Sequence, residues 1–334
     1  MNALTKHRYS PEQPLQVGGQ AVIEGVMMRG PRILATAVRR RDGRIEVLRE
    51  PYTALGDRAK TFKLPVLRGA AGLVEMLSIG IRSLNYSARV AMEDEGGAAA
   101  ASPGRNTEEK KGMALGLTVA VALLLGVALF FVTPLLLATL LFNVAQEALL
   151  FNLAAGFVRL VLFLAYLSGI SLLKDVRRLF AYHGAEHKSV FAFELGQPLT
   201  VHAALLQSRL HPRCGTSFLL IVMLAAIVLF ALVDTVLIAM LGTLTIGVRL
   251  AVHLPLIPLI GGLSYEVIRW TARHTGSSWG RLLVLPGLWL QRITTREPDE
   301  AQLEVALTAL RAAIGEEEPA TQSSASGVLE AGGR

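Results

Sequence analysis

The chain has 334 residues, of which 52% are hydrophobic, and its mean hydropathy is +0.47. These values exclude an ordinary soluble domain of this length and indicate an integral membrane protein. We attribute the net charge of +7 to membrane topology and attraction to anionic lipid, because no basic patch with interleaved aromatic residues favours nucleic-acid binding.

Residues 1–62 are predicted to form a small cytosolic β-rich unit. Glycines bracket a short β-type run at 18–30, and two further strands, 34–39 and 44–48, flank a turn at Asp42-Gly43. Glu24 and Arg29 interrupt the apolar run. We expect them to form a buried pair or to line a site, and the structural role is favoured.

Residues 63–95 are predicted to form an amphipathic helix in the membrane interface. Four charged residues seven positions apart follow one stripe of this helix, whereas leucine and methionine side chains occupy its other faces. They are Arg68, Glu75, Arg82 and Arg89. The alternative is a helix that packs on the cytosolic unit. The charged, Ala- and Gly-rich segment 96–112 is expected to be a flexible linker.

Four apolar runs are each long enough to cross a bilayer as a helix. They are 113–142, 149–173, 217–240 and 244–268. We expect two transmembrane hairpins, 113–173 and 217–268, with a kink at Pro255 and Pro258. The predicted fold class is therefore mainly α and integral membrane, with about four transmembrane helices, a small N-terminal cytosolic β unit and interfacial amphipathic helices.

The basic residues predict the orientation of the spans. Of the 33 Lys and Arg residues, all but Arg159 and Arg249 lie before the first span, between the second and third, or after the fourth. We expect the protein to lie in the cytoplasmic membrane. The positive-inside rule then places both termini and segment 174–216 in the cytoplasm. No cleavable signal peptide is expected, because the first ten residues lack an apolar core.

Segment 269–315 is predicted to form cytosolic amphipathic helices. Trp279 and Trp289, close to basic residues, are typical of anchoring at the level of the lipid headgroups. A helix is expected to start at 297–300 and to end at Gly315, with an apolar stripe that needs a packing partner. Segment 316–334 is expected to be disordered.

The motif His183-Gly184-Ala185-Glu186-His187 carries the chemistry of this sequence. If it is helical, the two imidazoles lie one turn apart on one face, where both reach a single ion. The pattern is the inverted form of the zinc-protease signature, in which the glutamate acts as a general base. The alternative is that both histidines hydrogen-bond to backbone or lipid headgroups and bind no metal.

A catalytic zinc site needs a third protein ligand, and the segment after the motif offers two candidates. His211 and Cys214 are favoured, because Cys214 is the only cysteine and cannot form an intramolecular disulfide. His202 and Glu194 are weaker candidates. A divalent metal, with zinc preferred for a donor set of imidazole and thiolate, is therefore the expected cofactor.

Four blocks of the sequence resemble the YqhQ family of bacterial multi-pass membrane proteins. They are 18–30 (GGQAVIEGVMMRG), 182–188 (YHGAEHK), 211–218 (HPRCGTSF) and 294–298 (TTREP). The family is described as a domain of unknown function and as predicted metal-dependent enzymes. The resemblance implies that His183, Glu186, His187, His211 and Cys214 fall on its motif positions, and it implies no particular substrate.

The favoured function is a metal-dependent hydrolase of zinc type at the cytosolic membrane surface, with membrane lipid as its environment. Glu186 is the expected general base, and Arg213 or Lys188 is expected to stabilise an oxyanion or to bind a headgroup phosphate. Arg213 is equally explained by the positive-inside rule. A homo-oligomer is compatible with this interpretation.

Two other classes of function compete with the hydrolase. One is a non-catalytic membrane assembly or scaffold protein, in which His183, His187, His211 and Cys214 close a four-ligand structural site. The weaker one is a transporter, because the titratable residues near the spans lie mostly near their ends. These residues are Arg159, Asp234, Arg249, His253 and Glu266.

Overall fold

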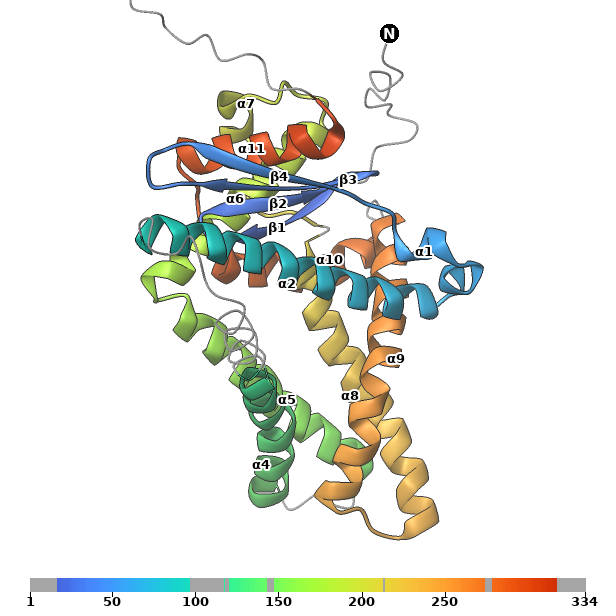
Figure 1. The fold of residues 1–334 in the computed structure, drawn as a ribbon. Coiled ribbons are helices and arrows are strands. Elements are labelled where there is room, and N and C mark those ends of the chain that lie inside the picture. The colour runs from blue at the N-terminus through green and yellow to red at the C-terminus, as the bar shows by residue number, and fades with distance from the viewer. Residues whose placement is uncertain are drawn as a thin grey trace, which may run out of the picture.

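The computed structural model describes residues 17–96, 117, 120–142, 147–212, 214–273 and 278–316. Long helices extend from one side of a small sheet that is covered by further helices (Figure 1). The predicted linker 96–112 and tail 316–334 lie, apart from their first residues, outside the described residues. So does residue 213.

The β-rich unit is a four-stranded antiparallel sheet in the order β1-β2-β3-β4. Its strands are β1 (Gly18–Val22), β2 (Gly25–Arg29), β3 (Ile33–Arg39) and β4 (Ile45–Pro51). The turn at Asp42-Gly43 is confirmed, and Gly43 there adopts a φ of 88°. The run 18–30 forms a hairpin and not one strand, because the chain turns at Ile23-Glu24, where Glu24 has a φ of 52°.

Both faces of this sheet are covered. The pleat directs Met27 and Leu34 toward α2 (Leu67–Gly96), whereas Val26 and Ala35 face α6 (Lys174–Glu194) and α11 (Glu300–Ile314). Figure 1 shows α2 below the sheet and α11 above it. Helix α11 begins at an Asp299 capping box and ends at Gly315, as predicted, and its apolar stripe packs on the sheet and α6.

Helix α2 has a second apolar face besides the one on the sheet. Ile79, Tyr86 and Val90 are buried against the sheet, while Val74 and Leu77 are 66% and 65% exposed. In Figure 1, α2 lies across the ends of the long helices, between them and the sheet. The helix therefore packs on protein, as one interpretation held, and also presents the exposed apolar face that the interfacial interpretation requires.

Within the described part of the chain, four helices are long and apolar enough to cross a membrane, and they agree with the four predicted runs. They are Ala120–Leu141, Ala148–Ile170, Phe218–Leu241 and Ile246–Trp270. The first contains a π-helical turn, η3 (Ala128–Val132), before α4 (Thr133–Phe142). The others belong to α5 (Ala148–Ile170), α8 (Gly215–Leu241) and α9 (Ile246–Arg273), and α9 stays helical through Pro255 and Pro258. The protein is a mainly α membrane protein.

A buried polar cluster connects three of these helices. Asp234 on α8 accepts hydrogen bonds from Asn152 on α5 at 2.8 Å and from His253 on α9 at 2.9 Å, and it pairs with Arg249. Asp234, Arg249 and His253 are at most 1% exposed. These titratable groups, expected mostly near the ends of the spans, are enclosed between helices, where pairing offsets part of their desolvation.

The remaining elements of the described chain are three short helices and one longer helix. They are α1 (Leu55–Arg58), η1 (Lys60–Lys63), α7 (Val201–Leu205) and α10 (Ser278–Thr294). The ion pair between Arg68 on α2 and Glu266 on α9 joins α2 to the fourth long helix. Trp289 on α10 is 52% exposed, whereas the side chain of Trp279 lies outside the described part of the chain.

Candidate metal centre

Helix α6 is continuous through the histidine motif, so the predicted pairing of the imidazoles is confirmed. The ring centroids of His183 and His187 are 4.4 Å apart. Cys214 caps the N-terminus of α8, where its Sγ accepts from the backbone N–H of Thr216 at 3.4 Å. This position brings the Cys214 Sγ to 3.3 Å from the His183 Nε2. One ligand atom each from His183, His187 and Cys214 lies within 4.8 Å of the other two.

Backbone carbonyls hold both imidazoles in the orientation that a metal ligand needs. The His183 Nδ1 donates to the carbonyl oxygen of Thr294 at 2.9 Å, and the His187 Nδ1 donates to that of Arg209 at 2.5 Å. Because a carbonyl only accepts, each Nδ1 carries the proton and each Nε2 keeps its lone pair. Within the described part of the chain, the buried Nε2 of His187 has no hydrogen-bond partner.

Glu186 lies beside these ligands and is only 6% exposed. Its Oε2 is 3.5 Å from the His187 Nε2, a contact too long for a good hydrogen bond. Burial raises the pKa of the Glu186 carboxyl, while His183, His211 and the Gly19 backbone N–H oppose that rise. Burial lowers the pKa of His187, which favours the neutral, metal-binding imidazole.

Two glycines allow the backbone to approach this helix closely. A Cβ at Gly19 on β1 would lie 2.7 Å from the Glu186 Cγ, and one at Gly184 would lie 2.0 Å from the Arg296 carbonyl oxygen. The sequence pattern predicts no role at the site for either glycine. It predicts none for Thr294 or Arg209 either, because they act through backbone carbonyls that every residue possesses.

His211, a favoured ligand candidate, is placed next to the three-residue group but not in it. Its Nε2 lies 3.3 Å from the Glu194 Oε2, and its ring packs on Phe191 with centroids 4.3 Å apart. Gln291 on α10 binds both the backbone N–H and the carbonyl of His211, at 2.7 and 2.8 Å. His202 lies on α7 and is exposed, apart from the group.

The two basic candidates have different outcomes. Lys188 is buried, and its Nζ contacts the Leu205 carbonyl and the Glu297 Oε2, both at 3.0 Å. Its ammonium thus links α6 to two other segments. Arg213 lies outside the described residues, and its role stays a prediction.

The prediction that Glu24 and Arg29 form a buried pair is wrong. Glu24 instead pairs with Arg178 on α6, and the Tyr182 hydroxyl donates to Glu24 at 3.3 Å. The Arg29 guanidinium lies near the Tyr52 hydroxyl, at 3.5 Å, and near Met76. The turn between β1 and β2 is therefore joined to the turn of α6 that precedes the histidine motif.

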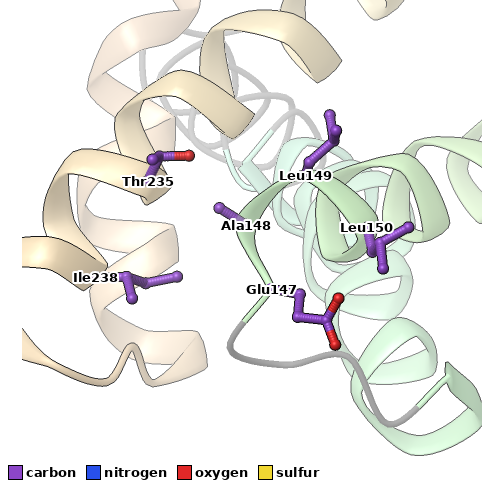
Figure 2. A pocket seen from close by; sticks show the side chains of 6 residues that line it. All are labelled: Glu147, Ala148, Leu149, Leu150, Thr235 and Ile238. Atoms are coloured by element: carbon purple, nitrogen blue, oxygen red, sulfur yellow. The ribbon is translucent and has the colours of Figure 1, made fainter.

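A pocket of about 390 Å³ lies at the opposite end of the long helices, between the start of α5 and the end of α8 (Figure 2). Leu149, Leu150 and Ile238 contribute aliphatic walls, and Figure 2 shows the Glu147 carboxylate directed away from α8. The Thr235 hydroxyl donates to the Ala231 carbonyl at 2.7 Å. This pocket gathers no set of polar groups comparable with the one on α6.

Comparison with known proteins agrees with the resemblance seen in the sequence. The family described as "Protein of unknown function (DUF1385)" matches residues 64–316. The chain is 35% identical over 315 residues to "Uncharacterized protein YqhQ" of Bacillus subtilis (strain 168), covering 91% of this chain and 92% of that protein. No solved structure matches it. The chain therefore belongs to the DUF1385 family and is a relative of YqhQ.

Proposed function

We propose that this protein is a zinc-dependent hydrolase at the cytosolic face of the cytoplasmic membrane. The observation that carries the proposal is the tautomer set by the two carbonyls, which leaves the Nε2 atoms of His183 and His187 as acceptors beside the Cys214 sulfur. The buried Nε2 of His187 has no hydrogen-bond partner among the described residues, which supports the proposal further, since a buried acceptor without a partner is costly and a cation would satisfy it.

The donor set fits zinc. Two imidazole nitrogens and one thiolate are ligands that zinc prefers, and catalytic zinc usually has three protein ligands and one open position. His211 is engaged by Glu194 and so is not needed as a fourth ligand. When bound, zinc would act as a Lewis acid that makes water a better nucleophile near neutral pH.

Glu186 is the residue we assign to proton transfer. Its carboxylate is buried next to the ligand group, on the same helix, where it would accept a proton from the attacking water and pass it to the leaving group. The Gly19 N–H and the close packing of β1 against its side chain hold the carboxylate in place. The Lys188 ammonium is engaged by the Leu205 carbonyl and by Glu297, so we assign Lys188 a structural role and not a catalytic one.

The cytosolic placement of this site is part of the proposal and rests on the positive-inside rule. The site lies beyond the end of α5 and at the start of α8, and the segments before the first span, between the second and third, and after the fourth contain 31 of the 33 Lys and Arg residues of the sequence.

A structural metal site in a scaffold protein is the second candidate. The 3.5 Å contact between Glu186 and His187 favours the structural site, because it brings the Glu186 carboxylate close enough to serve as a fourth ligand. Four protein ligands would close the site to substrate.

Metal analysis of the purified full-length protein in detergent tests the proposal. We expect about one zinc per chain in the wild type, loss of zinc in the double variant His183→Ala/His187→Ala, and retention in the control His202→Ala. Full zinc content in the double variant would refute metal binding at this site. Glu186→Gln should keep its zinc, whereas loss of zinc in that variant would identify Glu186 as a ligand and favour the scaffold.

Labelling of the single cysteine gives an independent reading. A maleimide should react with Cys214 in chelator-treated protein, and zinc should slow that reaction if the thiolate is a ligand. Equal rates with and without zinc would remove Cys214 from the ligand set.

A further inference from the structure

We propose that a basic pocket on the opposite side of α6 binds a phosphate group. The pocket has a volume of about 710 Å³, and its charged lining consists of Lys174, Arg177, Arg178, Arg296 and Glu297. Pockets of several hundred cubic ångströms are of the size that holds a headgroup or another small ligand.

The pocket and the metal centre use different faces of the same helix. Lys174, Arg177 and Arg178 share one stripe of α6 with Ala181, which also lines the pocket. His183 follows Ala181 by two residues, which is a little more than half a helical turn, so the histidine pair faces away from the pocket. The inference therefore goes beyond the proposed hydrolase and does not depend on it.

The pocket keeps a positive charge after its ion pairs are counted. Arg178 is paired with Glu24, and the acidic Glu297 is paired with Lys188 and Arg209. Among the described residues, Lys174, Arg177 and Arg296 form no ion pair. Three cations thus remain around one open space, which is an arrangement that attracts a multivalent anion.

Arg296 shows that the pocket is more than a row of basic residues on one helix that sets the orientation in the membrane. It comes from the segment between α10 and α11, far from α6 in sequence, and its backbone N–H is fixed on the Phe180 carbonyl at 2.8 Å. The Arg296 Nε is buried and, within the described residues, has no hydrogen-bond partner. Because Arg296 lines the pocket, the guanidinium can bind a phosphate there.

The position of the pocket favours the phosphate of a lipid headgroup, although free phosphate has the same chemistry. Lys174 begins α6 directly after α5, one of the membrane-spanning candidates, and Leu172 and Leu173 just before it are 70% and 59% exposed. Cations beside exposed leucines at the end of a span match the boundary between headgroups and acyl chains.

The test uses the full-length protein in neutral detergent with two probes, dioctanoylphosphatidylglycerol followed by native mass spectrometry and inorganic phosphate followed by equilibrium dialysis. We expect Arg177→Gln/Arg296→Gln to weaken binding of the recognised probe about tenfold or more. The charge-matched control Arg32→Gln/Arg44→Gln removes two exposed cations outside the pocket and should bind as the wild type does.

Binding of the lipid alone identifies a headgroup site, and binding of inorganic phosphate identifies a site for free phosphate; both support the proposal. Equal weakening in the two double variants, or no binding of either probe by the wild type, would overturn it. If Arg177→Gln/Arg296→Gln unfolds, the exposed Lys174→Gln single variant carries the test. Zinc content should be unchanged in every variant, so failure here is separate from failure of the metal centre.

Discussion

The Nδ1 of His183 donates a hydrogen bond of 2.9 Å to the carbonyl oxygen of Thr294, a residue 111 positions further along the chain. The last residue of α10 thus orients a ligand candidate on α6. Because α11 follows this segment and packs on the sheet and on α6, the geometry of the centre depends on docking of the C-terminal segment.

This dependence can be tested at Gly184. Gly184→Ala would place a methyl group 2.0 Å from the Arg296 carbonyl oxygen, and the segment that carries Thr294 would have to move. We expect a loss of about 1–3 kcal/mol in stability, as for other overpacked sites, together with weaker zinc binding.

Thermal unfolding and metal analysis check the result. The control is Gly72→Ala on α2, where an added Cβ meets no atom of the described residues within 4 Å and alanine should be neutral or stabilising by up to about 1 kcal/mol. Wild-type melting and wild-type zinc content in Gly184→Ala would show that the segment can shift without consequence.

The buried cluster on Asp234 should be essential for packing of the membrane helices. Asp234→Ala removes the buried carboxylate that pairs with Arg249, and breaking a buried ion pair from one side costs about 3–5 kcal/mol. We expect Asp234→Ala/Arg249→Leu to recover part of this loss, because it removes both charges. The measurement is thermal unfolding in detergent. Asp175→Ala, at an exposed position, should cost less than about 1 kcal/mol, and an equally small effect of Asp234→Ala would contradict a packing role.

The proposed orientation in the membrane predicts the location of two loops. A reporter fused after Gly196, between α6 and α7, should lie in the cytoplasm, and one after Gly242, between α8 and α9, should lie outside. Alkaline phosphatase and a fluorescent protein distinguish the two sides. An external signal at Gly196 would reverse the proposed topology and move the metal centre to the other face of the membrane.

Helix α2 is predicted to lie with its exposed apolar face in lipid. In a Cys214→Ser background, a spin label at Leu77 should be more accessible to oxygen than to a water-soluble nickel complex. A label at Arg82, on the charged stripe about 140° around the helix, should show the opposite preference. The protein is measured in vesicles that contain anionic lipid. Equal exposure of both labels to the nickel complex would place α2 in water.

The sequence alone determined the features that depend on neighbouring residues. Four apolar runs predicted the long helices, and the spacing of His183 and His187 predicted their common face, because helical period and hydrophobicity are local properties. The limits of α11 followed from Asp299 and Gly315, which stabilise helix ends through their own side chain and backbone. The turn at Gly43 was predictable for the same reason.

Only the tertiary structure decided which residues meet. It paired Glu24 with Arg178 and not with Arg29, and it placed His211 beside Glu194 while Cys214 joined the histidine pair. It also selected the carbonyls of Thr294 and Arg209 as anchors for the imidazoles. Backbone carbonyls and charged side chains at many positions of the sequence offer the same chemistry. The packing of the sheet, α6 and α10 decides which of them come into contact.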